Sequence, residues 1–221
     1  MKTDSIALGV RIGQMVDPAF FCSWTEALIG AVRPSDVVLM PAVGLPHSGA
    51  CNALAERFLR TRCDALLLID DDMVFRPSDI DAIRASTGDY AVFSGLYTTR
   101  REPIRPIALW WNGEAWAGKP TEELRGIIDC DVVGFGFTLI SRGLIEQVAK
   151  LRGADMGIFT WTNRQGEDGE FCMLAAQLGH KVGINCGVRI GHRVTYTSRW
   201  NAEDQAVEME IESFGMHERK G

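Results

Sequence analysis

The sequence lacks three features, each of which would mark a well-defined class of protein. Its longest unbroken aliphatic run covers residues 65–69, whereas a membrane-spanning helix needs roughly 20 consecutive apolar residues. Its 6 cysteines form no C-x-x-C pair, which excludes a zinc knuckle and a thioredoxin-like redox motif. The turn after the first strand-like segment reads Gly9-Val-Arg-Ile-Gly13-Gln, which is not the G-x-G-x-x-G of a Rossmann oxidoreductase.

Positively charged side chains are also fewer than negatively charged ones. The chain has 23 Lys and Arg against 29 Asp and Glu, a formal net charge of −6, so no global basic field draws in nucleic acid or anionic membrane. A local basic patch would have to come from Arg100, Arg101 and Arg105. No apolar stretch of signal-peptide length follows Met1, so the expected compartment is the cytoplasm, with the cysteines as buried free thiols.

The pattern that is present predicts an α/β fold. The 221 residues are 46% hydrophobic and 24% charged, as in an ordinary globular domain. Strand-like and helix-like segments alternate through the first hundred residues, which indicates a parallel sheet covered by helices. The predicted strands are 6–12, 37–40, 64–69, 90–96, 131–140 and 181–190, and the predicted helices begin at Pro18, Ala50, Ser78 (as N-cap), Gly143 and Phe171. We expect one domain over residues 1–200 and a polar tail, helical or frayed, over 201–221.

Three adjacent carboxylates, Asp70, Asp71 and Asp72, follow the apolar strand 64–69. Like charges so close repel one another unless a cation lies among them. They also fall at the carboxyl end of a buried strand, where ligands bind in open α/β sheets. Hard oxygen ligands suit Mg²⁺ or Mn²⁺, which commonly bridges to phosphate. Capping of the next helix is the structural alternative, and it explains Asp72 at most.

Around this motif the sequence resembles GT-A-fold glycosyltransferases, close to family-2-like and phage-type members. The resemblance covers about residues 5 to 195 and rests on landmarks in the family's order: the D-x-D of Ile69-Asp-Asp-Asp72-Met, Ser94-Gly-Leu-Tyr97 followed by Arg100, Val133-Gly-Phe-Gly136 before Ser141-Arg142, Gly166-Glu-Asp168, and Gly191-His192. It implies one Rossmann-like, mixed and mostly parallel sheet flanked by helices. It also implies metal-dependent transfer of a sugar from a nucleotide diphosphate, usually of uridine, to an acceptor hydroxyl.

The resemblance further implies roles for individual residues. The Mn²⁺ or Mg²⁺ ligands would be Asp70, Asp72 and His192, with Asp70 and the middle residue Asp71 also facing the nucleotide. Asp168, with Glu167 second, would take the acceptor proton; acids at a helix start are also favourable by themselves. The remaining nucleotide contacts would be Gln14, Asp17 and Asn52, although Cys51 stands where the family often has an arginine.

The acceptor side is less defined. Trp110, Trp111 and Trp116 could stack on sugar faces or pack inside a hairpin. Direct displacement with inversion is predicted; a retaining enzyme is the alternative. The acceptor would be a glycan, a small molecule or, as in a phage-type DNA glycosyltransferase, hydroxymethylated pyrimidines in DNA. A non-catalytic domain that binds carbohydrate or nucleotide-sugar is a further alternative. A sugar nucleotidylyltransferase would need a glycine-rich basic loop near the N-terminus, which the sequence lacks.

Overall fold

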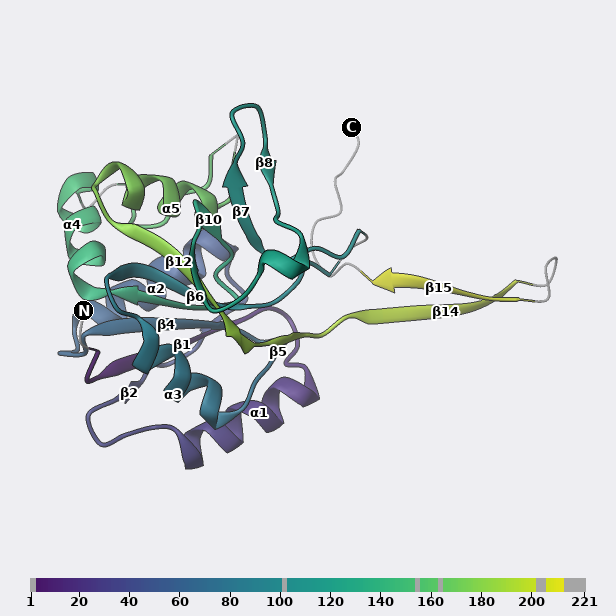
Figure 1. Cartoon of the computed structure of the whole chain (residues 1–221). Coiled ribbons are helices and arrows are strands. Elements are labelled where there is room, and N and C mark those ends of the chain that lie inside the picture. Colours follow the sequence, from purple (N-terminus) through teal and green to yellow (C-terminus); the bar gives the residue numbers. More distant parts are fainter. Residues whose placement is uncertain (1–2, 101–102, 154–155, 163–164, 202–205, 213–221) are drawn as a thin grey trace.

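The computed structural model describes residues 3–100, 103–153, 156–162, 165–201 and 206–212. A large mixed sheet lies at the centre, with helices on both of its faces (Figure 1). Its strands are β1 (Ile6–Ile12), β2 (Val37–Val38), β3 (Ala42–Val43), β4 (Ala65–Asp70), β6 (Tyr90–Leu96), β9 (Ile127–Asp129), β11 (Phe137–Ser141) and β12 (Lys181–Arg189). No helix in the described part of the chain is both long and apolar enough to cross a membrane.

The strands follow the order β2-β1-β4-β11-β6-β12-β9, with β3 paired to the end of β1. Strands β2, β3 and β4 run parallel to β1, and β12 runs parallel to β6. The inserted strand β11 is antiparallel to both β4 and β6, and β9 is antiparallel to β12. The mixed, mostly parallel sheet expected from the sequence is therefore confirmed.

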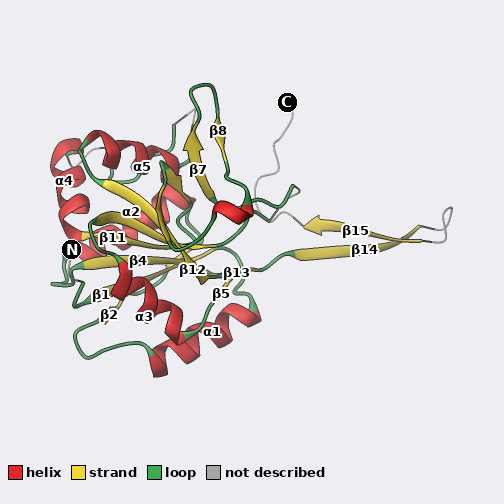
Figure 2. Ribbon diagram, viewed as in Figure 1, coloured by secondary structure: helices red, strands yellow, loops and turns green. Residues whose placement is uncertain are grey.

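Helices cover the two faces of this sheet separately (Figure 2). One face carries α1 (Pro18–Gly30) and α3 (Pro77–Ser86); the other carries α2 (His47–Leu59), α4 (Arg142–Arg152) and α5 (Glu167–Gln177). The apolar run in β4 suits this arrangement because both of its faces are covered. Leu66 and Leu68 belong to the core under α2, α4 and α5, whereas Leu67 and Ile69 belong to the core under α1 and α3.

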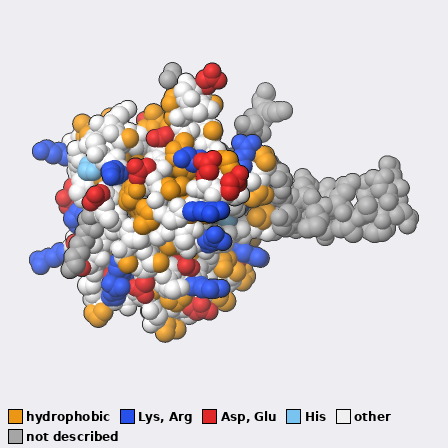
Figure 3. All heavy atoms as spheres, viewed as in Figure 1, with side chains coloured by type: hydrophobic (Ala, Val, Ile, Leu, Met, Phe, Trp, Pro, Cys, Tyr) orange, Lys and Arg blue, Asp and Glu red, His pale blue; other side chains and the backbone are white. Residues whose placement is uncertain are grey.

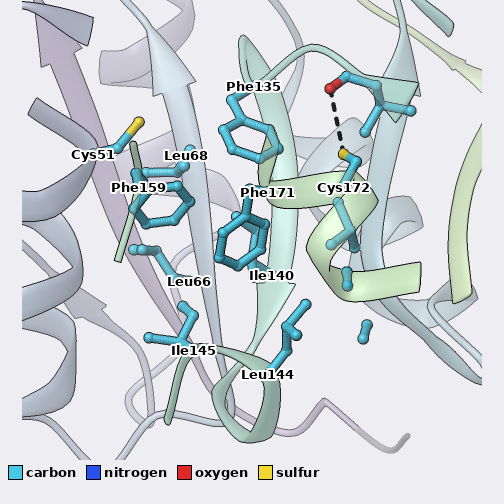
Figure 4. Packing of buried hydrophobic residues seen from close by; sticks show 14 of the residues in the cluster. Cys51, Leu66, Leu68, Phe135, Ile140, Leu144, Ile145, Phe159, Phe171 and Cys172 are labelled. Carbon is cyan, nitrogen blue, oxygen red and sulfur yellow. Dashed lines mark hydrogen bonds between the residues drawn. The ribbon is translucent and has the colours of Figure 1, made fainter. Parts of the chain in front are cut away.

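Aromatic rings fill the core beneath α5 (Figure 4). Phe159 stacks on Phe171 with ring centroids 4.5 Å apart, and Phe135 meets both rings edge-on. Leu144 and Ile145 of α4 close the same layer. This packing fixes the start of α5, where the predicted acidic motif lies.

Three smaller sheets stand outside the central one. One is an antiparallel sheet beside α5 that consists of β7 (Ala108–Trp111), β8 (Trp116–Ala117) and β10 (Val132–Val133) (Figure 1). The 3₁₀ turn η1 (Thr121–Glu123) lies in the chain between β8 and β9. Strand β5 (Met73–Val74) pairs with β13 (Gly191–His192). Strands β14 (Thr195–Asn201) and β15 (Ala206–Glu212) pair as a hairpin that extends away from the central sheet (Figure 1).

The structure corrects several expectations about single elements. Of the tail expected to be helical or frayed, residues 206–212 form β15, so the helical alternative is wrong there, and 213–221 lie outside the described residues. The predicted strand 131–140 is broken into β10 and β11. Helix α5 begins four residues earlier than Phe171, at Glu167. The N-cap of α3 is Arg76, whose N–H donates to the Asp79 carboxylate, and not Ser78.

Two expectations about burial are also corrected. The predicted strand 37–40 forms only β2, whose valines are exposed because β2 lies at the sheet edge. Five of the cysteines are buried free thiols as expected, but Cys22 is exposed on α1.

Candidate active site

A buried arginine organises the carboxyl end of the central strands. Arg11 of β1 lies in register with Asp70 of β4 and donates to both of its oxygens, Nε to Oδ1 at 2.6 Å and Nη2 to Oδ2 at 2.9 Å. Its Nη1 donates to Glu167 Oε1 at 3.0 Å and to the Cys51 sulfur at 3.2 Å. Burial lowers the pKa of Arg11, but Asp70, Cys51 and Glu167 outweigh it and hold that pKa above its usual range. Arg11 thus links the acidic motif to the start of α5.

Replacing Arg11 with methionine should destabilise the fold strongly, because two carboxylates would remain without their buried partner. Breaking such a group costs about 3–5 kcal/mol in the free energy of unfolding. As a matched control, Arg33→Met removes an exposed pair with Asp81 and should cost at most about 1 kcal/mol. Urea unfolding curves of both variants measure the difference, and equal losses would contradict the organising role of Arg11.

The middle carboxylate shapes the loop that follows β1. Asp71 Oδ2 accepts the Gly13 N–H at 2.7 Å, and its carbonyl accepts the Asp17 N–H at 3.2 Å. Burial raises the pKa of Asp71, and the charges of Asp72 and Asp70 raise it further. Asp17 caps α1 through the Ala19 N–H and also accepts from Arg193 Nε at 3.2 Å. The exposed Gln14 stands on the same loop.

The third carboxylate faces a histidine. The pairing of β5 with β13 brings His192 beside Asp72, with Nε2 and Oδ2 3.3 Å apart. His192 Nδ1 lies 2.6 Å from the Thr98 carbonyl oxygen, which can only accept, so this nitrogen carries a proton. Its Nε2 faces the Asp72 carboxylate oxygen Oδ2. Such a contact is favourable only with a proton or a cation between the two atoms.

The other carboxylate oxygen of this pair has no protein partner. Asp72 Oδ1 is buried and accepts no hydrogen bond, while Oδ2 accepts from Arg100 Nη1 at 2.8 Å. Burial raises the pKa of Asp72, but the hydrogen bond and charge of His192, with the charge of Arg100, lower it below its ordinary value. Asp72 is therefore held as a carboxylate with an unsatisfied oxygen.

A cavity of about 310 Å³ opens between α5 and the β7–β8 hairpin. Its polar lining comes from Thr99, Arg105, Gln165 and Asp168, and its apolar lining includes Trp116. Gln165 Oε1 is buried there without a hydrogen-bond donor. Burial raises the pKa of Asp168, and the neighbouring Glu167 raises it further. Such a carboxyl group in a cavity is suited to proton transfer.

The three tryptophans predicted for the acceptor have different positions. Trp116 lines the cavity, and Trp111 packs edge-on against it with ring centroids 5.3 Å apart while its side chain stays half exposed. Trp110 donates its indole N–H to the Asp129 carbonyl oxygen at 2.7 Å and packs against the core. Trp110 therefore has the packing role that was the alternative.

Tyr97 joins the two halves of the site, and the sequence did not assign it a role. Its ring is buried and meets His192 edge-on, with centroids 5.6 Å apart. Its hydroxyl accepts the Gly136 N–H at 2.8 Å, and a Cβ on Gly134, which lines the cavity, would overlap that hydroxyl. One side chain thus packs against His192 on one side and against Gly134, which lines the cavity, on the other.

No family model matches the sequence, and no curated protein matches it. Solved structures do match the fold. A197 from STIV aligns with a TM-score of 0.60 at 14% identity over 98% of this chain and 100% of that one. GalNAc-T7, solved with UDP, GalNAc and Mn²⁺, aligns with a TM-score of 0.51 at 13% identity over 86% of this chain and 44% of that one. The fold is GT-A.

A weaker likeness to this GT-A fold is seen in the inositol-1-phosphate CTP transferase from T. maritima, with a TM-score of 0.46 at 11% identity over 86% of this chain and 90% of that one. At these identities the comparisons show the fold alone.

Within the GT-A fold, the structure separates the predicted site residues into groups. Asp72 lies with His192, and Asp168 lies with Trp116 in the cavity, whereas Asp70 and Glu167 are bound to Arg11. In the described part of the chain, no group of three or more His, Cys, Asp or Glu side chains is arranged to hold a metal ion. The expected three-residue ligand set is therefore not assembled.

The remaining predicted residues are Asn52 and the arginines of the predicted basic patch. Asn52 Oδ1 accepts the N–H groups of Ile158 and Phe159, and its Nδ2 donates to the Phe159 carbonyl oxygen at 2.7 Å. Its amide therefore anchors that loop, and we do not propose Asn52 as a nucleotide contact. Of the predicted basic patch, Arg101 lies outside the described residues, Arg100 binds Asp72, and Arg105 lines the cavity.

Proposed function

We propose that this chain is a metal-dependent glycosyltransferase that moves a sugar from a nucleotide diphosphate to an acceptor hydroxyl, with inversion. The observation that carries the proposal is the pairing of Asp72 with His192. One buried Asp72 oxygen has no hydrogen-bond partner among the described residues, and the other faces His192 Nε2, so the pair supplies two ligands for a cation. Mg²⁺ and Mn²⁺ are commonly held by one or two carboxylates completed by substrate phosphates.

Asp72 and His192 would hold the metal, and its chemistry there would be to neutralise charge on the departing diphosphate. The carbonyl of Thr98 orients the imidazole, as outer partners do for metal-binding histidines. Mn²⁺ and a uridine donor are supported by the fold likeness to GalNAc-T7, whose structure contains UDP and Mn²⁺.

The nucleotide lies, in this proposal, on the loop that follows β1. Asp71 holds this loop against the acidic motif through the Gly13 N–H, and Gln14 and Asp17 are the side chains it offers to the base and ribose. Asp70 faces the ribose rather than the metal, because Arg11 fixes both of its oxygens while a fifth of its side chain stays exposed.

Asp168 is the proposed base. Its partner candidate Glu167 is bound to Arg11 and buried, whereas Asp168 lines the cavity with a raised pKa. The acceptor would lie on Trp116 and Trp111, whose rings suit the C–H face of a sugar.

A glycan or small-molecule acceptor fits these features better than DNA. The cavity volume of about 310 Å³ is at the small end of the range for small-molecule pockets. On the face in Figure 3, Lys and Arg side chains lie among Asp and Glu and do not gather into a broad basic patch. A DNA-binding surface would need such a patch to contact phosphates.

Donor hydrolysis tests the proposal most directly. In a panel of nucleotide-sugars without acceptor, we expect slow release of the nucleotide diphosphate with Mn²⁺ or Mg²⁺ and a fall to background in excess EDTA. The wild-type chain with Ca²⁺ or without added metal is the control. Undiminished turnover in EDTA would overturn the metal's role. Binding of a donor without turnover on any acceptor class would favour the non-catalytic binding domain.

A further inference from the structure

Arg100 occupies the oxygen that a bridging cation would need. Its Nη1 lies 2.8 Å from Asp72 Oδ2, and that oxygen is also the one 3.3 Å from His192 Nε2. A cation that bridges Asp72 and His192 through Oδ2, the oxygen that faces the imidazole, would use this same oxygen. Because two positive groups on one oxygen repel each other strongly, the guanidinium and the cation are competitors for Asp72.

The backbone before Arg100 is held by hydrogen bonds, whereas the Arg100 side chain is partly exposed. The Thr98 carbonyl binds His192, the Thr99 N–H donates to the Arg105 carbonyl at 2.8 Å, and Thr98 bridges to Pro106. The Arg100 side chain is 42% exposed, and its Nη1 donates to Asp72 Oδ2. Arg100 therefore combines a backbone anchored beside the Asp72–His192 pair with a side chain that is partly open to solvent.

We propose that Arg100 exchanges partners during donor binding, leaving Asp72 for the diphosphate of the nucleotide-sugar. The inference rests on the proposed function, since it concerns the same site. A guanidinium displaced from a carboxylate finds another anionic partner in a phosphate group, two of whose oxygens can accept its parallel N–H groups. Arg100 would then bind the leaving group and neutralise part of its charge.

The exchange predicts opposite effects on two affinities. Arg100→Gln removes the competing cation, so Mn²⁺ binding to the protein alone should tighten about fivefold to tenfold. The same change removes a charged hydrogen bond to the diphosphate, so UDP binding at saturating Mn²⁺ should weaken about tenfold or more. Free Mn²⁺ measured by electron paramagnetic resonance gives the first affinity, and calorimetry of UDP gives the second.

Arg193→Gln is the matched control for the Mn²⁺ titration. Arg193 follows His192, and its backbone N–H binds the Asp72 carbonyl, but its side chain pairs with Asp17. The Arg193→Gln substitution removes one positive charge from the same neighbourhood without freeing the Asp72 carboxylate. The Mn²⁺ affinity of this variant should therefore rise less than twofold. Arg100→Lys keeps the charge but not the two parallel N–H donors, so it should restore part of the UDP affinity.

The outcomes separate the two proposals. Wild-type protein that binds Mn²⁺ and UDP, with an Arg100→Gln variant of unchanged Mn²⁺ affinity, overturns the exchange and leaves the proposed function standing. A variant in which both affinities weaken also overturns it, because Arg100 would then only support the site. If the wild-type protein binds neither Mn²⁺ nor UDP, the proposed function fails and the exchange fails with it.

Discussion

Replacing Asp72 with asparagine should weaken Mn²⁺-dependent donor binding by at least about 100-fold. The substitution keeps the shape of the side chain but removes the charge that faces His192 and Arg100. Changes to the outer partners of metal ligands already cost 10–100-fold in affinity, so loss of a direct ligand costs more. Calorimetric titration of UDP into protein with saturating Mn²⁺ measures the effect.

Asp71→Asn is the control for this experiment. This substitution neutralises the adjacent carboxylate, whose Oδ2 accepts the Gly13 N–H. An asparagine oxygen can still accept that hydrogen bond. We expect a loss of less than about tenfold, consistent with one weakened charged hydrogen bond. Equal losses in the two variants would mean that the acidic motif acts through its summed charge and not through Asp72.

Asp168→Asn should lower kcat by about 10²–10⁴-fold, the usual contribution of a general base, while donor affinity changes less than about twofold. Asp168 lines the cavity beside Gln165 and does not contact Asp72 or His192 in the structure. Its neighbour on the same helical turn, Glu170, does not line the cavity. Glu170→Gln is therefore the control, with kcat unchanged, and it separates proton transfer from the effect of acids at a helix start.

The pH profile gives a second readout for Asp168. Burial, and then the charge of Glu167, raises the pKa of Asp168, so a larger share of the carboxyl is protonated in mildly acidic solution than for an ordinary aspartate. The wild-type kcat should rise with pH through this raised pKa, and the acid limb should be missing from Asp168→Asn.

A β-linked product from an α-linked donor, seen by NMR, would agree with inversion; an α-linked product would refute it.

The order of elements in the first half of the chain follows from the sequence because each strand there is an apolar run between amphipathic helices. Strands β1 and β6 have the predicted bounds, residues 6–12 and 90–96. The break between β10 and β11 was not predictable in the same way. A strand pattern tolerates glycine. A Cβ on Gly134 would overlap the Tyr97 hydroxyl and a Cβ on Gly136 would overlap the end of the Met73 side chain, which only the folded structure shows.

The candidate site was predictable only where its residues are neighbours in sequence. The acidic motif is local, so its place at the end of β4 could be read directly. Arg11 could not be assigned, because one arginine near the end of an apolar strand carries no signal and its partners are 59 and 156 residues away. The sequence likewise does not show what Asn52 contacts, because its hydrogen-bond partners lie 106 and 107 residues further along the chain.

The insertion of β11 between β4 and β6 has a consequence for how the nascent chain matures. Leu139 pairs with Leu67 on one side and with Phe93 on the other, so the middle of the sheet closes only after residues 137–141 have been synthesised. Pairings so distant in sequence slow folding, and until they form, β4 presents an open hydrogen-bonding edge. The strand that ends in the acidic motif is thus open to mispairing on the ribosome, and the candidate site is complete only after His192 has emerged.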